Sequence, residues 1–277
     1  MSFASSMKKR WPLLTAIALC LLTFAAMPAR SAAQLSASQM ETKGAARRAK
    51  ARNILLVHGA WSDGSSFEKV IPLLQDEGFH VVSVQIPLTS FSDDVATTRR
   101  ALALEDGPVL LVGHSYGGAV ITEVGNDPKV VGLVYLAALA PEVGESTSSL
   151  LNSVSATPLF SELSQDAHGF LKVSEKGYLA DFVEGIPEKE QRILAATQEP
   201  TNAASLGGTV TVASWKEKPS WYIVTETDRA VATELQRFMS KRISASTISV
   251  RSCHVVMFSH PEVVASVVTL AALGFHW

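Results

Sequence analysis

Apolar runs of strand length alternate with helical patterns from residue 53 onward, and this alternation limits the fold more than any other feature. The runs are residues 54–57, 80–86, 109–112, 130–139, 221–225 and 247–250. A continuous apolar run such as Ile-Leu-Leu-Val at 54–57 is typical of a strand buried on both faces. Strands separated by helices need right-handed crossovers, which place helices on both faces of a sheet. The sequence therefore predicts an α/β fold with a mainly parallel six-stranded sheet.

Helices are expected between and after the strands. They cover residues 63–77, 92–104, 117–125, 232–241 and 261–274. Ser92 is the predicted N-cap of the second helix, with Asp93 and Asp94 in its first turn. Pro261 suits the first position of the last helix, and Gly274 suits its end.

The alternation breaks between the fourth and fifth strands. Residues 141–215 contain helical pieces and no strong strand signal. Because a structureless loop of that length is rare in a compact domain, we expect an inserted helical cap. The predicted domain thus covers residues 53–277, with the cap at about 141–215. The apolar side chains of the cap are expected to pack onto the core or to face a pocket.

The N-terminal segment has the pattern of an export signal. Lys8, Lys9 and Arg10 precede an apolar run at 13–26, and small residues follow before Gln34. This predicts a signal peptide over residues 1–33, cleaved after Ala33, and a periplasmic or secreted protein with no stable membrane span after cleavage. The alternatives are an uncleaved anchor and, less favoured, a lipoprotein. Residues 34–52 are polar and basic and are expected to form a tether.

Charge and composition restrict the partners. The formal net charge is −2 with no basic stripe, which argues against nucleic-acid binding. After signal cleavage Cys253 is the one remaining cysteine, so an intrachain disulfide is excluded. No metal or dinucleotide motif is present in the sequence, and no cofactor is expected. The sequence does not indicate an oligomeric state.

The segment Gly-His-Ser-Tyr-Gly at 113–117 carries the strongest chemical signal. It follows a predicted buried strand and precedes a predicted helix, which is the setting of a nucleophile elbow. Such a turn holds a serine hydroxyl above the sheet at the electropositive start of a helix. Ser115 is therefore the predicted nucleophile.

A tetrahedral oxyanion needs two converging backbone N–H groups. One would come from Tyr116, the residue after the nucleophile, and the other from the loop after the first strand. Ala60 is the preferred second donor and Trp61 the alternative. His58, in the same loop, is expected to brace the loop by hydrogen bonding.

A serine nucleophile also needs a base and an orienting acid, which follow it in the order acid, then histidine. Asp228 comes just after the fifth strand and is the predicted acid, with Glu226 and Glu142 as alternatives. His254 comes after the sixth strand and is the predicted base. His260 is less favoured because it precedes Pro261 at a helix-capping position. We expect Arg229 to be a solvated or salt-bridged neighbour and Cys253 to be a packing residue.

Taken together, these residues resemble the α/β-hydrolase superfamily. The segment 55–61 is similar to the start of small serine esterases related to methyl-salicylate esterases and hydroxynitrile lyases, and the elbow at 113–118 matches theirs. Residues 218–224, Asp228 and His254 resemble a bacterial group of α/β hydrolases. The resemblance implies the α/β-hydrolase fold, a Ser115–Asp228–His254 triad, and oxyanion donors at Ala60 and Tyr116.

Two positions favour an esterase within this group. Hydroxynitrile lyases of the branch carry threonine where this chain has Gly59, and a lysine near the acid, where this chain has Arg229. Haloalkane dehalogenases of the same fold need an aspartate nucleophile, which Ser115 excludes.

The predicted function is hydrolysis of carboxylic esters through an acyl-enzyme. The substrate would be a small or medium, partly apolar ester, contacted by Trp61 and Ser62. The alternatives are a ligand-binding protein on a hydrolase scaffold, or another triad reaction: lactone opening, C–C hydrolysis, perhydrolysis or hydroxynitrile lysis.

Overall fold

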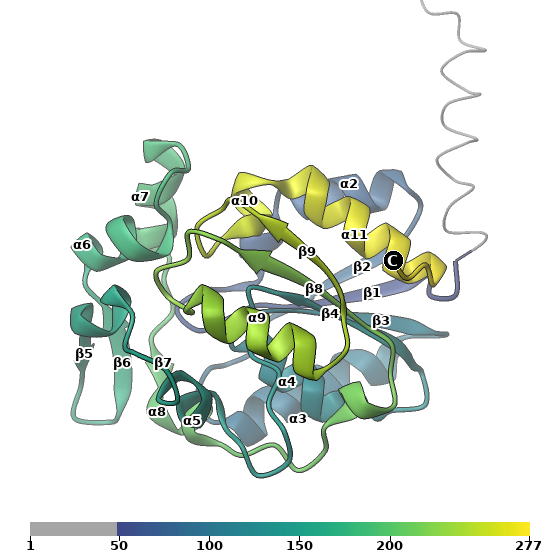
Figure 1. Ribbon diagram of the computed structural model, residues 1–277, viewed down its shortest axis with the longest axis horizontal. Helices are drawn as coiled ribbons and strands as arrows, with labels where there is room; N and C mark the ends of the chain where they lie inside the picture. Colours follow the sequence, from purple (N-terminus) through teal and green to yellow (C-terminus); the bar gives the residue numbers. More distant parts are fainter. Residues whose placement is uncertain (1–48) are drawn as a thin grey trace, which may run out of the picture. The chain divides into compact units, whose positions relative to one another are not determined.

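The computed structural model describes residues 49–277, which form one main sheet with helices on both faces and a cap (Figure 1). The six strands are β1 Asn53–Val57, β2 His80–Val84, β3 Val109–His114, β4 Val130–Leu136, β8 Ser220–Thr225 and β9 Ser246–Val250. All neighbours pair in parallel, in the order β2-β1-β3-β4-β8-β9. The α/β class and the six-stranded parallel sheet are thus confirmed.

Helices cover the two faces of the sheet. The helices α2 Val70–Asp76 and α11 Pro261–Leu273 pack together on one face (Figure 1). On the other face lie α3 Phe91–Leu104 and α4 Gly117–Val124, with α9 Thr233–Arg242 beside β8. Every residue of β1, β3 and β8 is buried between these layers, which explains their continuous apolar runs.

Two of the predicted helix starts are wrong. The helix expected at 63–77 is split into a 3₁₀ turn, Gly64–Phe67, and α2. Pro72 explains the break, because it lacks an N–H and its ring would clash with the carbonyl four residues earlier in a continuous helix. The N-cap of α3 is Ser90 rather than Ser92, and its hydroxyl accepts a hydrogen bond from the N–H of Asp93.

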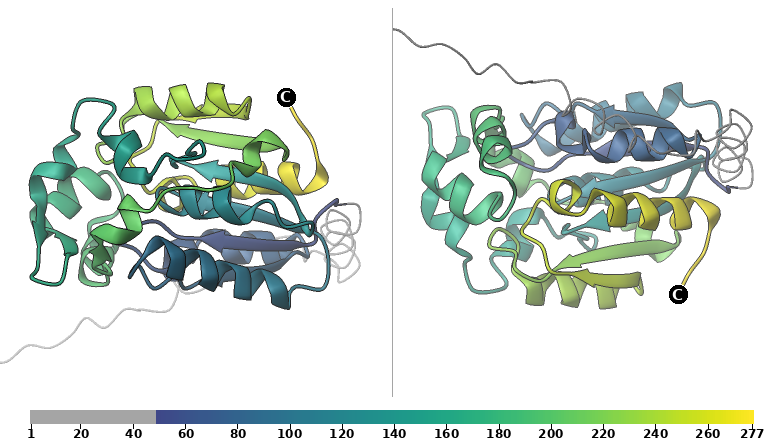
Figure 2. Two further views of the ribbon diagram at one scale, coloured as in Figure 1. Left: turned by 90° about the horizontal axis from the view of Figure 1, so that it is seen from below. Right: turned by 90° about the horizontal axis from the view of Figure 1, so that it is seen from above.

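The cap region contains strands as well as helices. Its helices are α5 Thr147–Leu151, α6 Glu175–Gly177, α7 Glu188–Ala196 and α8 Ala203–Gly207, with a π-helical turn at Tyr178–Phe182. Three short strands, β5 Leu163–Gln165, β6 Phe170–Val173 and β7 Thr201–Asn202, form a second, antiparallel sheet that the sequence did not predict. Figure 2 shows the cap at one end of the main sheet, where the strands reach their carboxyl ends. The last short helix, α10 Val256–Ser259, joins β9 to α11.

The chain before β1 is described only from residue 49. Lys50 and Ala51 both donate backbone hydrogen bonds to the carbonyl of Ala272 in α11, at 2.8 and 3.2 Å, and Ala51 is buried. Residues 49–52 therefore pack against the domain. The predicted signal peptide, and residues 34–48 of the predicted tether, lie outside the described residues. No helix in the described part has the length and apolar character to cross a membrane.

Candidate active site

Ser115 stands at the sharp turn between β3 and α4. Its φ of 53° is a left-handed conformation that L residues seldom adopt, and it is the strain expected at a nucleophile elbow. The turn fits only because Gly117 has no side chain: a Cβ there would lie 2.3 Å from the carbonyl oxygen of Val57. The backbone of Ser115 donates to Leu136 and accepts from Gly118 and Leu139, at 3.0–3.1 Å. Local backbone bonding therefore holds the serine in its strained conformation.

His254 and Asp228 form a buried pair. The Nδ1 of His254 lies 2.7 Å from the Oδ2 of Asp228, and both side chains are at most 1% exposed. Since an ionised carboxylate can only accept, the Nδ1–H of His254 donates to Asp228, and Nε2 is the ring nitrogen left for another partner. This Nε2 is buried and has no hydrogen-bond partner among the described residues. Nε2 is thus the atom of this pair that is available to a further partner.

The loop that carries His254 is anchored to the elbow. The residue before Ser115, His114, donates from its Nε2 to the backbone carbonyl of His254 at 3.1 Å, and the two rings lie 4.6 Å apart. Burial lowers the pKa of His114 well below its ordinary value, so its ring is neutral and donates from one nitrogen. His114 therefore links the elbow to the histidine loop, although its residue type alone did not indicate this role.

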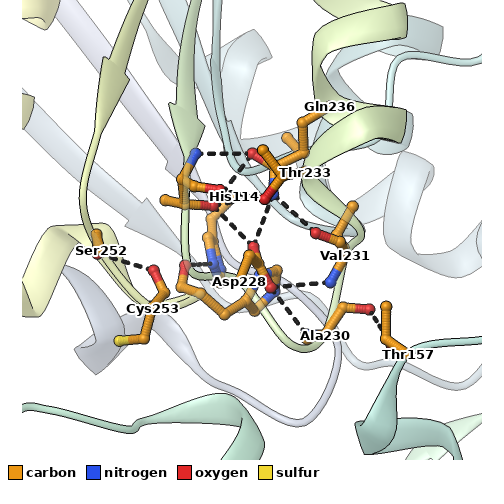
Figure 3. A network of polar contacts seen from close by, with 12 residues as sticks. His114, Thr157, Asp228, Ala230, Val231, Thr233, Gln236, Ser252 and Cys253 are labelled. Atoms are coloured by element: carbon orange, nitrogen blue, oxygen red, sulfur yellow. Dashed lines mark hydrogen bonds and ion pairs between the residues drawn. The ribbon is translucent and has the colours of Figure 1, made fainter.

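Asp228 is held by four donors besides the histidine (Figure 3). Its Oδ1 accepts from the backbone N–H groups of Ala230 and Val231, at 2.8 and 2.9 Å. Its Oδ2 accepts from the Thr225 hydroxyl and the Gln236 amide, both at 2.8 Å. These bonds hold the carboxylate in one orientation, aimed at His254. The sequence analysis did not identify Gln236. The one feature that could have indicated it is its position, as a polar residue, on the buried side of α9.

The other acidic candidates lie in different contacts. Glu226 forms an ion pair with Arg237 at 3.1 Å, and Glu142 forms one with Lys216 at 2.6 Å. Within residues 49–277, neither of these two carboxylates forms a hydrogen bond to His254.

The remaining polar neighbours are also accounted for. His260 is only half-buried, and its Nδ1 lies 2.9 Å from the hydroxyl of Ser259. Arg229 donates to Asp181 of the cap at 2.6 Å. Cys253 is buried, and this burial raises the pKa of its thiol to about 11, which suits a packing residue.

The loop after β1 lies against the elbow. A Cβ on Gly59 would be 2.7 Å from the Cβ of Ser115, so the two backbones approach as closely as glycine permits. In this loop the N–H of Trp61 donates to the hydroxyl oxygen of Thr201 at 2.9 Å. The N–H groups of Ala60 and Tyr116 donate to no protein group among residues 49–277. One of these N–H groups thus follows Ser115 in the chain, and the other belongs to the loop whose Gly59 contacts Ser115, while the Trp61 N–H is taken up by Thr201.

His58 braces this loop from inside. Its Nε2 accepts from the N–H of Ile86 at 3.1 Å, and its Nδ1 donates to the carbonyl of Gly59 at 2.9 Å. Burial lowers its pKa, so the ring stays neutral and keeps both bonds.

Phe182 of the cap packs against two residues of the candidate site. Phe182 packs edge-on against His254, with ring centres 4.8 Å apart, and edge-on against Trp61 at 6.5 Å. Both Trp61 and Ser62, the predicted substrate contacts, are 5% exposed. A cavity of about 620 Å³ lies beside the site, between the cap and the histidine loop, and Ile186, Cys253 and His260 are among its lining residues. Ser115, Asp228 and His254 do not line it.

Comparison with known proteins agrees with this architecture. The family model described as the alpha/beta hydrolase family matches residues 54–267. A carbendazim-hydrolysing esterase from Nocardioides sp. strain SG-4G is 37% identical over 115 residues, which are 36% of this chain and 47% of that protein. A pyrethroid hydrolase from Sphingobium wenxiniae is 27% identical over 249 residues, covering 78% of this chain and 86% of the relative.

Solved structures give the same result for the fold. The crystal structure of polyneuridine aldehyde esterase superposes with a TM-score of 0.70 at 17% identity, over 80% of this chain and 98% of the other. Because the family model spans well over half of the sequence, the resemblance to this superfamily is confirmed, and the chain belongs to the alpha/beta hydrolase family.

Proposed function

We propose that the protein is a serine esterase that hydrolyses carboxylic esters through an acyl-enzyme. Ser115 is the nucleophile, His254 the general base and Asp228 the orienting acid. The observation that carries the proposal is the buried His254–Asp228 pair, whose free Nε2 belongs to a loop hydrogen-bonded to the nucleophile elbow.

The reaction follows from these groups. The Nε2 of His254 takes the proton of Ser115 as its oxygen attacks the ester carbonyl, and Asp228 stabilises the imidazolium that forms. The N–H groups of Ala60 and Tyr116 hold the tetrahedral oxyanion, and each donor of this kind lowers the barrier by about 2.7–4 kcal/mol. The intermediate then expels the alcohol, which takes the proton from His254. Water, activated by the same base, cleaves the acyl-enzyme and releases the carboxylic acid.

The residues around the candidate site support a substrate class. Trp61 and Phe182 place aromatic surface beside His254, and Ser62 lies in the same loop as Trp61. Apolar walls with a few polar groups are typical of pockets for small organic molecules. Two relatives named for carbendazim and pyrethroid hydrolysis support the same class. The proposed substrate is a small or medium ester with a partly apolar acyl or alcohol group.

Export completes the proposal. The pattern of residues 1–33 supports cleavage after Ala33 and a periplasmic or secreted enzyme. N-terminal sequencing of the protein recovered outside the cytoplasm should begin at Gln34, and a mature protein that begins at Met1 would contradict this.

Hydrolysis of p-nitrophenyl esters of increasing acyl length tests the activity. Ser115→Ala should remain folded, lose turnover, and lose labelling by a fluorophosphonate probe. Wild-type protein that takes the label without repeated turnover would favour a ligand-binding protein instead. His254→Ala and His260→Ala, compared side by side, test the base: the first should be inactive and the second active.

A further inference from the structure

Three hydrogen bonds fasten Trp61 to the cap, each from a different part of it. The Trp61 N–H donates to the hydroxyl oxygen of Thr201 in β7 at 2.9 Å. The indole Nε1 donates to the carbonyl of Leu171 in β6 at 3.1 Å. The hydroxyl of Tyr178 in the π-helical turn donates to the Trp61 carbonyl at 3.1 Å. All donor and acceptor groups of this residue are therefore used by the cap.

The bond to Thr201 removes the Trp61 N–H from the possible oxyanion donors. Trp61 has a φ of 55°, a left-handed conformation that surrounding contacts must maintain. The Trp61 N–H is taken up by Thr201, whereas the neighbouring N–H of Ala60 has no protein acceptor among the described residues. The N–H of Ala60 belongs to the preceding Gly59–Ala60 peptide, and the bond to Thr201 fixes the Ala60–Trp61 peptide on the other side of the Ala60 Cα. Thr201 thus holds the backbone that presents Ala60.

We propose that Thr201, assisted by Tyr178, is a positioning residue of the oxyanion hole, so that the cap directs the Ala60 N–H at the reacting carbonyl. This inference rests on the proposed esterase function. It gives the cap a part in the chemical step in addition to covering the substrate.

The hydrogen bonds of Thr201 and Tyr178 to Trp61 are shielded from water. Thr201 is fully buried and Tyr178 is 1% exposed, so water does not compete for their hydroxyl groups. Burial also raises the pKa of Tyr178, and its hydroxyl therefore stays protonated and continues to donate to Trp61. A hydrogen bond in such surroundings holds its partner in one orientation, which is what an oxyanion donor requires.

Two substitutions at position 201 separate positioning from packing. Thr201→Val keeps the shape and removes the acceptor, whereas Thr201→Ser keeps the acceptor. Thr201→Val should lower kcat by about 10- to 100-fold, with KM changed by less than about threefold, because a small misplacement of a donor acts on the transition state. Thr201→Ser should retain kcat within about threefold of wild type, since it keeps the hydroxyl.

The control is Thr211→Val, another threonine of the segment 141–215, whose hydroxyl donates to Glu123 at 2.7 Å. It should leave kcat unchanged. Rates are measured on the full-length protein per active site titrated with a fluorophosphonate, so that partial misfolding does not count as lost catalysis. A trifluoromethyl ketone, whose adduct with Ser115 carries an oxyanion, should lose affinity for Thr201→Val by the same factor as kcat/KM.

Tyr178→Phe provides a second variant should Thr201→Val fail to fold, with Tyr135→Phe, a buried core hydroxyl, as its control. Tyr178→Phe should also lower kcat rather than raise KM. If Thr201→Val kept the wild-type kcat, or if only its KM rose, the inference would be overturned while the esterase function would stand. Turnover retained by Ser115→Ala would overturn both.

Discussion

The substitution Asp228→Asn tests the proposed mechanism most directly, because the carboxylate of Asp228 is surrounded by donors alone. Its Oδ1 accepts from Ala230 and Val231, and its Oδ2 accepts from Thr225, Gln236 and His254, all at 2.7–2.9 Å. An asparagine has one oxygen and one NH₂ group in the same space. Either orientation of the amide places NH₂ against groups that themselves donate.

The two orientations have different costs. With NH₂ in place of Oδ1, it faces two backbone N–H groups that cannot become acceptors. With NH₂ in place of Oδ2, the conflict with His254 is relieved when the imidazole changes tautomer, accepts at Nδ1 and carries its proton on Nε2. That tautomer cannot take a proton from Ser115. We therefore expect kcat to fall by about four powers of ten, or about 5.4 kcal/mol in the barrier. Unpaired buried donors should also lower the free energy of unfolding by about 1–3 kcal/mol.

The assay is p-nitrophenyl acetate hydrolysis, with chemical denaturation to measure stability. The matched control is Glu226→Gln, two residues away, where the carboxylate pairs with Arg237 at the surface. Losing one exposed pair of this kind should change stability by less than about 1 kcal/mol and leave kcat near wild type. If Asp228→Asn retained kcat within tenfold of wild type, or if Glu226→Gln were the inactive variant, the reasoning would be refuted.

Three further outcomes follow from the same geometry. Ser115→Gly should have a free energy of unfolding about 0.5–1 kcal/mol higher than that of Ser115→Ala, measured by thermal unfolding, because glycine relieves the strain at φ 53°; the reverse order would contradict the strain. Gly59→Ala should lower kcat/KM at least about tenfold, since its Cβ would lie 2.7 Å from that of Ser115; circular dichroism checks folding, and an unchanged rate would be inconsistent with this contact. Burial raises the pKa of Cys253 from 9.0 to about 11, so the folded protein at pH 8 holds less thiolate and iodoacetamide should label it about 100-fold more slowly than the unfolded chain; equal rates would disprove it.

The local parts of the site could be predicted from the sequence because they are contiguous. A buried strand, Ser115 and a helix follow one another within a few residues, and that order is enough to identify an elbow. Asp228 and His254 could be chosen because each follows a strand at the same edge of the sheet. The split near Pro72 was not predicted, although a proline inside a helical pattern is a signal for such a break.

The supporting contacts could not be predicted, because they join distant segments. Trp61 and Thr201 are separated by 140 positions, and nothing in the residues around either one indicates the other. Gln236 is a common helix residue whose role depends on the side of α9 that faces Asp228. The small sheet β5-β6-β7 was missed because its strands are two to four residues long, too short to form a periodic pattern.

The attachment of Trp61 to the cap also bears on protein engineering. Because the cap is an insertion between β4 and β8, exchanging it is one way to seek a new substrate range. In this protein a transplanted cap would also remove the partners of Trp61 at Leu171, Tyr178 and Thr201. A chimera that lacks a hydroxyl at the place of Thr201 should bind its new substrate and turn it over slowly. Recombination at the boundaries of the cap should therefore keep these three contacts, and libraries that vary the rest of the insertion should yield more active enzymes than whole-cap exchange.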